Sequence, residues 1–300
     1  MKIIETLRFN IDNISFLAFY NSTYCFIVTD NYRIFIYNMR NKTIELEFFH
    51  HSDMILNLKF HKNLVISSDL GRKTHLWNFN TGQIIYTHYS TREEARCMDI
   101  NDHYLLISNV ACIGTSRYKL VDETCKPLKG YHCEGFSLNG LKLENERFYA
   151  TTSQGYLLNA KVENARKLFK LKVSDYLSGV FNFNDKHFYL SSSLNKIMVL
   201  DRKTFKHLIT LEGHSTSVCG INCLTDFLIS YTIFSIFIPH GVIVIVRDIK
   251  TFDILTTITC SNRIKSINIT DDKLYALTKE GTMDIYTHNN FKECNQVYLE

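Results

Sequence analysis

A unit of about 40 residues recurs along the chain, and this period constrains the fold more than any single motif does. Each unit holds three or four short apolar strands, and the third strand usually ends in an apolar residue followed by Asp or Asn. Successive strand ends are separated by 40, 44, 38, 41, 47 and 39 residues. The seven strand ends are Tyr37-Asn38, Trp77-Asn78, Val121-Asp122, Asn159-Ala160, Leu200-Asp201, Arg247-Asp248 and Tyr286-Thr287. The spacing predicts one repeat array of seven units.

The strands themselves are predicted by apolar runs of four to seven residues, bounded by turns rich in Asn, Asp and Gly. The clearest unit runs from His50 to Tyr89, and no segment predicts a helix longer than two turns. The expected units span residues 10–49, 50–90, 91–130, 131–173, 174–211, 212–259 and 260–300, with residues 3–9 joining the last.

The composition supports a folded, β-rich protein. The chain is 45% hydrophobic and 21% charged, with 17 Tyr and 21 Phe, side chains that pack well on pleated sheets. Glu5 and Arg8 interrupt the apolar start of the chain, so we expect no secretory signal. Nine cysteines without such a signal favour free thiols in a reducing compartment. We expect a cytoplasmic protein, with the nucleus as the open alternative.

The two ends of the array pose a question of strand pairing. The segment Ile3–Phe9 precedes the first unit in the same way as His207–Leu211 precedes the sixth. It is therefore expected to supply the outer strand of the last unit, which removes an open sheet edge. The C-terminal segment Gln296–Leu299 competes for the same edge, either as an added strand or as a free end.

Several residues of the second and sixth units carry a family resemblance. Gly213-His214 precedes the first strand of the sixth unit, and His51 holds the matching position of the second. The second unit also offers Ser67 or Ser68 and Trp77-Asn78. The chain thereby resembles a degenerate member of the WD-repeat family. The resemblance implies an all-β fold, a single seven-bladed β-propeller.

In well-formed WD repeats a His, a Ser or Thr, an Asp and a Trp form a hydrogen-bonded chain. The resemblance assigns that structural role to His51, Ser67 and Trp77, and the first position of the sixth unit to His214. Asp69 is the available carboxylate, but it stands two residues before the usual turn position, which Gly71 holds. We therefore expect a partial version of the chain in the second unit.

The resemblance implies a non-catalytic scaffold or adaptor within a multi-subunit complex. The length is similar to that of propeller-only adaptors such as the ribosome-associated receptor for activated C kinase, with the subfamily left open. Proteins of a large assembly are the expected partners, with the phosphate backbone of rRNA as a further one. A protein-only adaptor of the coat, nuclear-pore or ubiquitin-ligase type is the alternative. No cofactor, membrane insertion or DNA partner is expected.

Basic residues form the first candidate surface. The segment 161–172 holds five basic residues against Glu163, and the fifth unit adds more in a nearby loop. Lysines on an outer strand can simply keep a sheet edge soluble, or they can dock on phosphates or carboxylates. Both interpretations stay open from the sequence. The candidate residues are Arg33, Arg166, Lys167, Lys170, Lys172, Arg202 and Lys203.

An apolar insertion between strands of the sixth unit, residues 232–241, forms the second candidate surface. A long apolar loop is a partner site if it is exposed, because exposed apolar patches mark interaction sites. Alternatively, the segment extends the hairpin and folds back onto its own sheet. The candidate residues are Phe234, Ile236, Phe237 and Ile238.

Catalytic and metal sites find little support. No Cys-x-x-Cys, Gly-x-Ser-x-Gly, phosphate loop or His-Glu-x-x-His motif occurs. Cys219 and Cys223 share one strand, and His50 and His51 are adjacent, so buried thiols and opposed side chains are the simpler interpretation. An enzyme or small-molecule binder that uses the mouth of the propeller channel is the remaining competing class.

Overall fold

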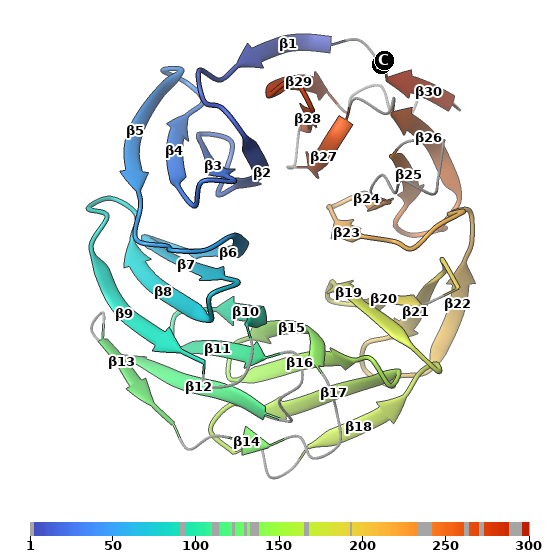
Figure 1. Cartoon of the computed structure of the whole chain (residues 1–300). Helices are drawn as coiled ribbons and strands as arrows, with labels where there is room; N and C mark the ends of the chain where they lie inside the picture. Colours follow the sequence, from blue (N-terminus) through green and yellow to red (C-terminus); the bar gives the residue numbers. More distant parts are fainter. Residues whose placement is uncertain are drawn as a thin grey trace. The chain divides into compact units, whose positions relative to one another are not determined.

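The computed structural model describes residues 3–90, 94–109, 114–121, 124–128, 131–132, 138–164, 168–192, 194–232, 242–260, 264–269, 273–287 and 296–299. Within these ranges the protein is all-β and contains no helix (Figure 1). Its strands form seven sheets of four main strands each, the blades of a seven-bladed β-propeller.

The chain divides into two compact units. One unit comprises residues 23–179, and the other comprises residues 1–22 together with 180–300. The strand order of the seven sheets is β2-β3-β4-β5, β6-β7-β8-β9, β10-β11-β12-β13, β15-β16-β17-β18, β19-β20-β21-β22, β23-β24-β25-β26-β30 and β1-β29-β28-β27.

The first four sheets hold the strands of the N-terminal half of the chain. The first contains β2 (Ile14–Phe19), β3 (Tyr24–Thr29), β4 (Ile34–Asn38) and β5 (Thr43–Phe48). The second contains β6 (Ile55–His61), β7 (Leu64–Asp69), β8 (Lys73–Asn78) and β9 (Ile84–Tyr89). The third contains β10 (Ala95–Ile100), β11 (Tyr104–Asn109), β12 (Gly114–Val121) and β13 (Thr124–Pro127), with β14 (Tyr131–His132) paired to β12. The fourth contains β15 (Leu138–Glu144), β16 (Arg147–Thr152), β17 (Tyr156–Lys161) and β18 (Phe169–Lys172).

The other three sheets hold the C-terminal half. The fifth contains β19 (Leu177–Phe183), β20 (His187–Ser192), β21 (Ile197–Asp201) and β22 (His207–Leu211). The sixth contains β23 (Gly220–Cys223), β24 (Phe227–Tyr231), β25 (Ile243–Asp248) and β26 (Ile254–Cys260), with β30 (Gln296–Leu299) at its edge. The seventh contains β27 (Ile264–Ile269), β28 (Lys273–Thr278) and β29 (Thr282–Thr287), with β1 (Ile3–Arg8).

The Asp or Asn that ends the third strand has a direct structural reason. In the second blade the Asn78 Oδ1 atom accepts the main-chain N–H of Asn80 at 2.9 Å, and the Gly82 N–H returns to the Asn78 carbonyl at 2.8 Å. Such side-chain acceptors stabilise the turn, because its main-chain N–H groups have no partner in the strand ladder. The same arrangement follows Asn38, Asp201 and Asp248. The repeat signature is therefore a turn cap.

The hairpin between the second and third strands is also built alike in several blades. A side-chain oxygen at its start accepts the N–H of the residue four positions later, as between Asp69 Oδ1 and Lys73 at 2.8 Å. The residue before that N–H has a positive φ, the conformation that glycine adopts most easily. Equivalent bonds join Thr29 to Arg33, Thr152 to Tyr156 and Thr278 to Thr282. The residues with positive φ at this position of the hairpins are Tyr32, Arg72, Gly155, Asn195 and Gly281.

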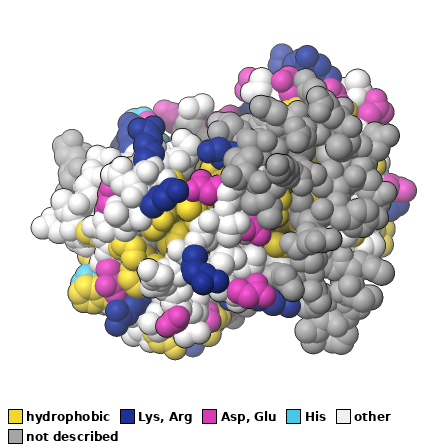
Figure 2. Space-filling model, turned by 90° about the horizontal axis from the view of Figure 1, so that it is seen from above, with side chains coloured by type: hydrophobic (Ala, Val, Ile, Leu, Met, Phe, Trp, Pro, Cys, Tyr) yellow, Lys and Arg dark blue, Asp and Glu magenta, His cyan; other side chains and the backbone are white. Residues whose placement is uncertain are grey.

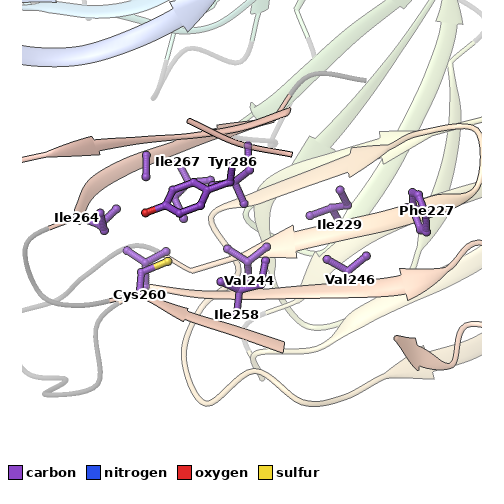
Figure 3. Close-up of a cluster of buried hydrophobic side chains, with 12 residues drawn as sticks. Phe227, Ile229, Val244, Val246, Ile258, Cys260, Ile264, Ile267 and Tyr286 are labelled. Carbon is purple, nitrogen blue, oxygen red and sulfur yellow. The ribbon is translucent and has the colours of Figure 1, made fainter. Parts of the chain in front are cut away.

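The cores lie between neighbouring sheets, where the middle strands bury both faces. One cluster joins the sixth and seventh blades and includes Val244, Ile258 and Ile264, each with 0% of its surface exposed (Figure 3). The ring of Tyr286 lies within this cluster (Figure 3). Apolar burial on this scale is the main stabilising contribution in such a fold, at roughly 25 cal/mol per Å².

The strand pairing of the two ends is now defined. β1 pairs antiparallel with β29, with Leu7 opposite Met283, and forms the edge of the sheet that also contains β28 and β27. The predicted competition from the C-terminal segment is wrong. β30 pairs in parallel with β26, with Val297 opposite Ile258, because β1 already occupies the edge of β29 and β26 still offers a free ladder.

A tyrosine hydroxyl in the core gives a first testable prediction. The Tyr286 hydroxyl is buried, and no described residue hydrogen-bonds it. A buried hydroxyl without a partner costs about 1–3 kcal/mol, so Tyr286→Phe is expected to leave the melting temperature unchanged or to raise it. Tyr189→Phe is the matched control, since the Asn184 Nδ2 atom donates to the Tyr189 hydroxyl at 3.1 Å. The control should lose about 1 kcal/mol. A large loss of stability in Tyr286→Phe alone would contradict this description of the core.

Candidate functional site

The second blade contains a buried chain of hydrogen bonds between four side chains. The Trp77 Nε1–H donates to Ser67 Oγ at 3.1 Å, and Ser67 Oγ lies 2.6 Å from His51 Nε2. His51 Nδ1 lies 2.8 Å from Asp69 Oδ2. All four residues that the sequence offered are joined, with Ser67 rather than Ser68 as the hydroxyl and with Asp69 reaching His51 from its earlier position. Ser68 instead donates to the Ala95 carbonyl at 3.0 Å.

The proton positions in this chain follow from its donors and acceptors. Because the Asp69 carboxylate can only accept, His51 donates from Nδ1, and a neutral His51 then accepts the Ser67 hydroxyl proton at Nε2. Burial alone would raise the pKa of the Asp69 carboxyl, but the hydrogen bonds from His51 and from the Lys73 amide outweigh it and hold that pKa below its usual range. Every polar atom of the chain is thereby satisfied.

The order Ser67, His51, Asp69 resembles that of a nucleophilic triad, in which a base activates a hydroxyl. Here the side chains of His51 and Asp69 are 0% exposed, and Ser67 is also 0% exposed. The Ser67 oxygen is further occupied by the Trp77 N–H. A substrate cannot reach the Ser67 hydroxyl. We therefore assign a structural role in the second blade to this chain of hydrogen bonds.

Aromatic packing adds to this role. The ring of Phe48 stacks on Trp77 with the ring centres 4.1 Å apart and the planes 11° apart. Phe48 ends β5 of the preceding blade, so the stacked pair ties the first and second blades. Stacked aromatic pairs contribute about 0.5–1.5 kcal/mol beyond their buried area.

The sixth blade keeps half of this arrangement. His214 Nε2 lies 2.7 Å from Ser230 Oγ, as at His51 and Ser67. Arg247, opposite Leu228 on β24, takes the place that Trp77 holds opposite Val65. Its Nη1 atom donates to the Phe252 carbonyl at 2.9 Å, and its Nη2 atom donates to the Glu212 carbonyl. Burial, with Arg247 nearby, lowers the pKa of His214 to about 4.

Three of the predicted basic residues lie on one compact unit and have partners or neighbours there. Arg33 pairs with Glu47, with Nη1 and Oε1 2.6 Å apart. Lys172 donates to the Gln154 carbonyl at 2.7 Å and lies 5.1 Å from the centre of the Tyr156 ring. Lys170 is exposed on β18. The ion pair of Arg33 with Glu47 engages one side of its guanidinium group.

The remaining basic candidates divide into two groups. On the other unit, Arg202 donates to the Asn184 carbonyl at 2.8 Å and lies over the Phe183 ring, with 4.6 Å from its guanidinium carbon to the ring centre. Lys203, in the same turn, is exposed. Arg166 and Lys167 lie outside the described residues. Of the seven basic candidates, the structure thus describes five, three on one compact unit and two on the other.

The apolar insertion also lies outside the described residues. Phe234, Ile236, Phe237 and Ile238 all fall within residues 233–241. The flanking Thr232 accepts the Ile243 N–H at its Oγ1 atom at 3.1 Å, so the hairpin that carries the insertion starts from a defined base.

A hollow that the sequence did not indicate lies at the hairpin tip of the first blade. Its volume is about 470 Å³. Tyr32 is 36% exposed and Phe49 65% exposed, and they line it together with the Arg33–Glu47 ion pair. The His51 side chain is fully buried, so His51 contributes main chain. We call this the hairpin hollow; its lining residues are Asn31, Tyr32, Arg33, Glu47, Phe49 and His51.

One signal in the sequence could have indicated this hollow. The turn Asp30-Asn31-Tyr32-Arg33 places a tyrosine where the turns of the fourth and seventh blades place glycine. An aromatic residue at a position that favours glycine is an exception to the local conformational preference, and such exceptions concentrate at functional sites.

A second, smaller hollow of about 210 Å³ is lined by the hairpin that joins β6 to β7 in the second blade and by the hairpin that joins β10 to β11 in the third. Asp102 occupies one side of it and pairs with both His61, at 2.9 Å, and Lys62. These pairs lower the pKa of Asp102 to about 2. The carboxylate is thereby neutralised by its own neighbours and offers little to a ligand.

Among the residues that the structure describes, no three His, Cys, Asp or Glu side chains gather as metal ligands would. No helix in the described ranges is long and apolar enough to cross a membrane. The six described cysteines are free thiols, and burial raises the pKa of Cys125 to about 11 and that of Cys260 to about 12.

Comparison with known proteins supports the fold. A solved structure of the computationally designed Ika8 protein is similar to this chain, with a TM-score of 0.67 over 92% of this chain and 96% of that chain. The fold is a β-propeller. At 13% sequence identity, the similarity to the designed protein extends to the fold alone. No family model matches the sequence, and no curated protein matches it.

The buried hydrogen-bond chain predicts large effects of substitution in the second blade. Trp77→Ala removes the stacked ring and is expected to cost about 3–5 kcal/mol of unfolding free energy. Ser67→Ala leaves the Trp77 N–H and His51 Nε2 unpaired and should cost about 1–3 kcal/mol. Urea unfolding followed by circular dichroism measures both. A loss well under 1 kcal/mol for Trp77→Ala would contradict the structure of this blade.

Buried histidines predict a pH dependence. Burial, with His51 nearby, lowers the pKa of His75 to about 4, whereas an unfolded histidine titrates near 6.5. Between these values the unfolded chain binds more protons, so the unfolding free energy falls as the pH falls from about 6.5 to 4. Fluorescence of the single tryptophan, Trp77, reports unfolding of the second blade. His75→Gln should flatten the dependence, and a urea midpoint that stays constant over this range would contradict it.

Proposed function

We propose that this protein is a non-catalytic scaffold that presents the hairpin tips of its blades to other macromolecules within a multi-subunit assembly. The contrast between a repeated backbone and varied side chains carries the proposal. Four described hairpins share the same side-chain cap and the same positive-φ position, yet their tips carry Tyr32, Arg72, Gly155 and Gly281 at that position. A rigid frame with variable tips is suited to recognition.

The character of the surface supports proteins as the main partners. Among the described residues in the view of Figure 2, Lys and Arg side chains lie interspersed with Asp and Glu side chains and with apolar ones. Nucleic-acid interfaces are much more positively charged than interfaces between proteins. The ion pair of Arg33 with Glu47 supports the same choice.

A ribonucleoprotein such as the small ribosomal subunit is the second candidate. Exposed lysines on β18 and in the turn after β21, at Lys170 and Lys203, favour it. Lysines of this kind can neutralise phosphates without reading sequence. A protein-only adaptor and a ribonucleoprotein subunit differ in whether RNA is required for assembly. For both candidates we propose a cytoplasmic location.

Gradient sedimentation of a native lysate, with and without RNase, tests the proposal directly. We expect this chain to migrate in a complex much larger than itself, and RNase resistance indicates a protein-only adaptor. Migration with ribosomal particles that is lost at high salt would indicate the ribonucleoprotein instead. Migration as a free monomer under all conditions would contradict the scaffold.

Charge reversal tests the lysines. Replacing Lys167, Lys170 and Lys172 with Glu should leave the protein folded, because Lys170 and Lys172 are exposed on an outer strand. In a ribonucleoprotein the variant should dissociate at a lower salt concentration, because each lost phosphate contact removes part of the electrostatic affinity. In a protein-only adaptor that does not use this strand, sedimentation should stay unchanged.

A further inference from the structure

We propose that the hairpin hollow is a docking site for an extended protein segment that places an apolar side chain against Tyr32 and Phe49 and a neighbouring carboxylate on Arg33. This inference rests on the proposed scaffold function and specifies the partner's chemistry at one site. The evidence comes from backbone conformation, exposure and charge at this hairpin.

The backbone of Tyr32 is the first observation. Its φ is +68°, in the left-handed region that residues with side chains rarely adopt. The same position is Arg72 in the second blade, also with a φ of +68°, Gly155 and Gly281 in the fourth and seventh, and Asn195 in the fifth. A tyrosine is therefore held where glycine would be less strained. Strain of this kind at a surface turn is typical of functional positions.

Two other aromatic residues with positive φ, Phe205 and Phe252, have ring contacts that explain their position. Phe205 has a φ of +58° and stacks on Phe188, with ring centres 5.6 Å apart. Phe252 has a φ of +66° and packs against His187, with ring centres 5.6 Å apart. Both rings fill space beside their own blades. Tyr32 is instead 36% exposed and faces the hairpin hollow.

Exposure of a second ring extends the apolar part of the site. Phe49 is 65% exposed, although Phe48 beside it is buried against Trp77. The Phe49 ring stacks on His50, with ring centres 5.0 Å apart and planes 21° apart. Exposed aromatic residues with a supported orientation are characteristic of protein interfaces, where they contribute a large part of the affinity.

The charge of the site selects the second group of the ligand. Arg33 is 50% exposed in its side chain and gives Glu47 one hydrogen bond, from Nη1, which leaves other N–H groups of the fork directed to no described residue. With Glu47 engaged by Arg33, a carboxylate is the complementary group.

The size of the hollow is consistent with a side chain and its flanking main chain. Its volume of about 470 Å³ lies in the range of sites that bind small ligands or single anchoring side chains. The site is built from the tip before β4 and the end of β5, which are held by the strand ladder between these strands. It is therefore formed before a partner binds, which lowers the entropy cost of docking.

Two sets of short fluorescein-labelled peptides test the proposal by fluorescence polarisation. One set carries Phe, Trp or Leu beside Asp or Glu, and the matched set carries Lys in place of the acidic residue. We expect members of the acidic set to bind the full-length protein, and Tyr32→Gly and Arg33→Gln each to weaken that binding by about ten-fold or more. Lys42→Gly is the matched control, because it relieves a positive φ of +58° at the other end of β4 and should leave binding unchanged.

Stability separates loss of the site from loss of the fold. Tyr32→Gly should keep or raise the melting temperature, because glycine adopts this φ without strain. A variant that is as stable as the wild type but no longer binds supports the proposal. Equal binding by wild type and Tyr32→Gly, preference for the Lys set, no binding by any acidic peptide, or Tyr32-dependent binding of a labelled oligouridine in place of peptides would each overturn it. If Tyr32→Gly still sediments in the large complex, the scaffold function stands without this site.

Discussion

The side-chain caps of the turns are the interaction on which the repeated structure depends. A strand that ends in a tight turn leaves main-chain N–H groups without ladder partners, and these groups need acceptors. Asn38, Asn78, Asp201 and Asp248 supply them after the third strand, and Thr29, Asp69, Thr152 and Thr278 supply them after the second. Once the turns are fixed, the register of each strand is fixed, and the apolar side chains face the neighbouring sheets.

This division between capped frame and free tip explains where stability and recognition are located. In the second blade, Asp69 serves both the turn, through Lys73, and the buried chain, through His51. One carboxylate thereby joins the hairpin tip to the core. At the first blade the cap is the hydroxyl of Thr29, and the tip carries Tyr32 at the position that Arg72 holds in the second. The residues that stabilise the frame and those that face a partner are therefore largely different residues.

Much of the fold could be predicted from the sequence, because it follows from local rules that repeat. The 40-residue period, the turn residues and the apolar runs indicated seven units, and the structure has seven sheets. The pairing of β30 could not be predicted, since an added parallel strand on β26 depends on which edges remain open after the other strands have paired. The participation of Asp69 was only partly expected, because its reach to His51 depends on the hairpin geometry rather than on spacing.

The candidate site was less accessible to sequence reasoning. Basic residues can be identified in a sequence, but the groups that they contact cannot. The contacts of Arg33 with Glu47 and of Lys172 with the Gln154 carbonyl are defined only by the structure. Conversely, Tyr32 and Phe49 look like ordinary aromatic residues of a β-rich chain. Their importance arises from a backbone angle and from exposure, and neither can be read from composition.

The most direct test of a capped, rigid frame is amide hydrogen exchange at the hairpin tips, measured residue by residue by NMR. The account predicts that the amides of Arg33, Lys73, Tyr156 and Thr282 exchange slowly, because each donates to a side-chain cap. Exchange of these amides at the rate of an unstructured loop, while the strands stay protected, would contradict it.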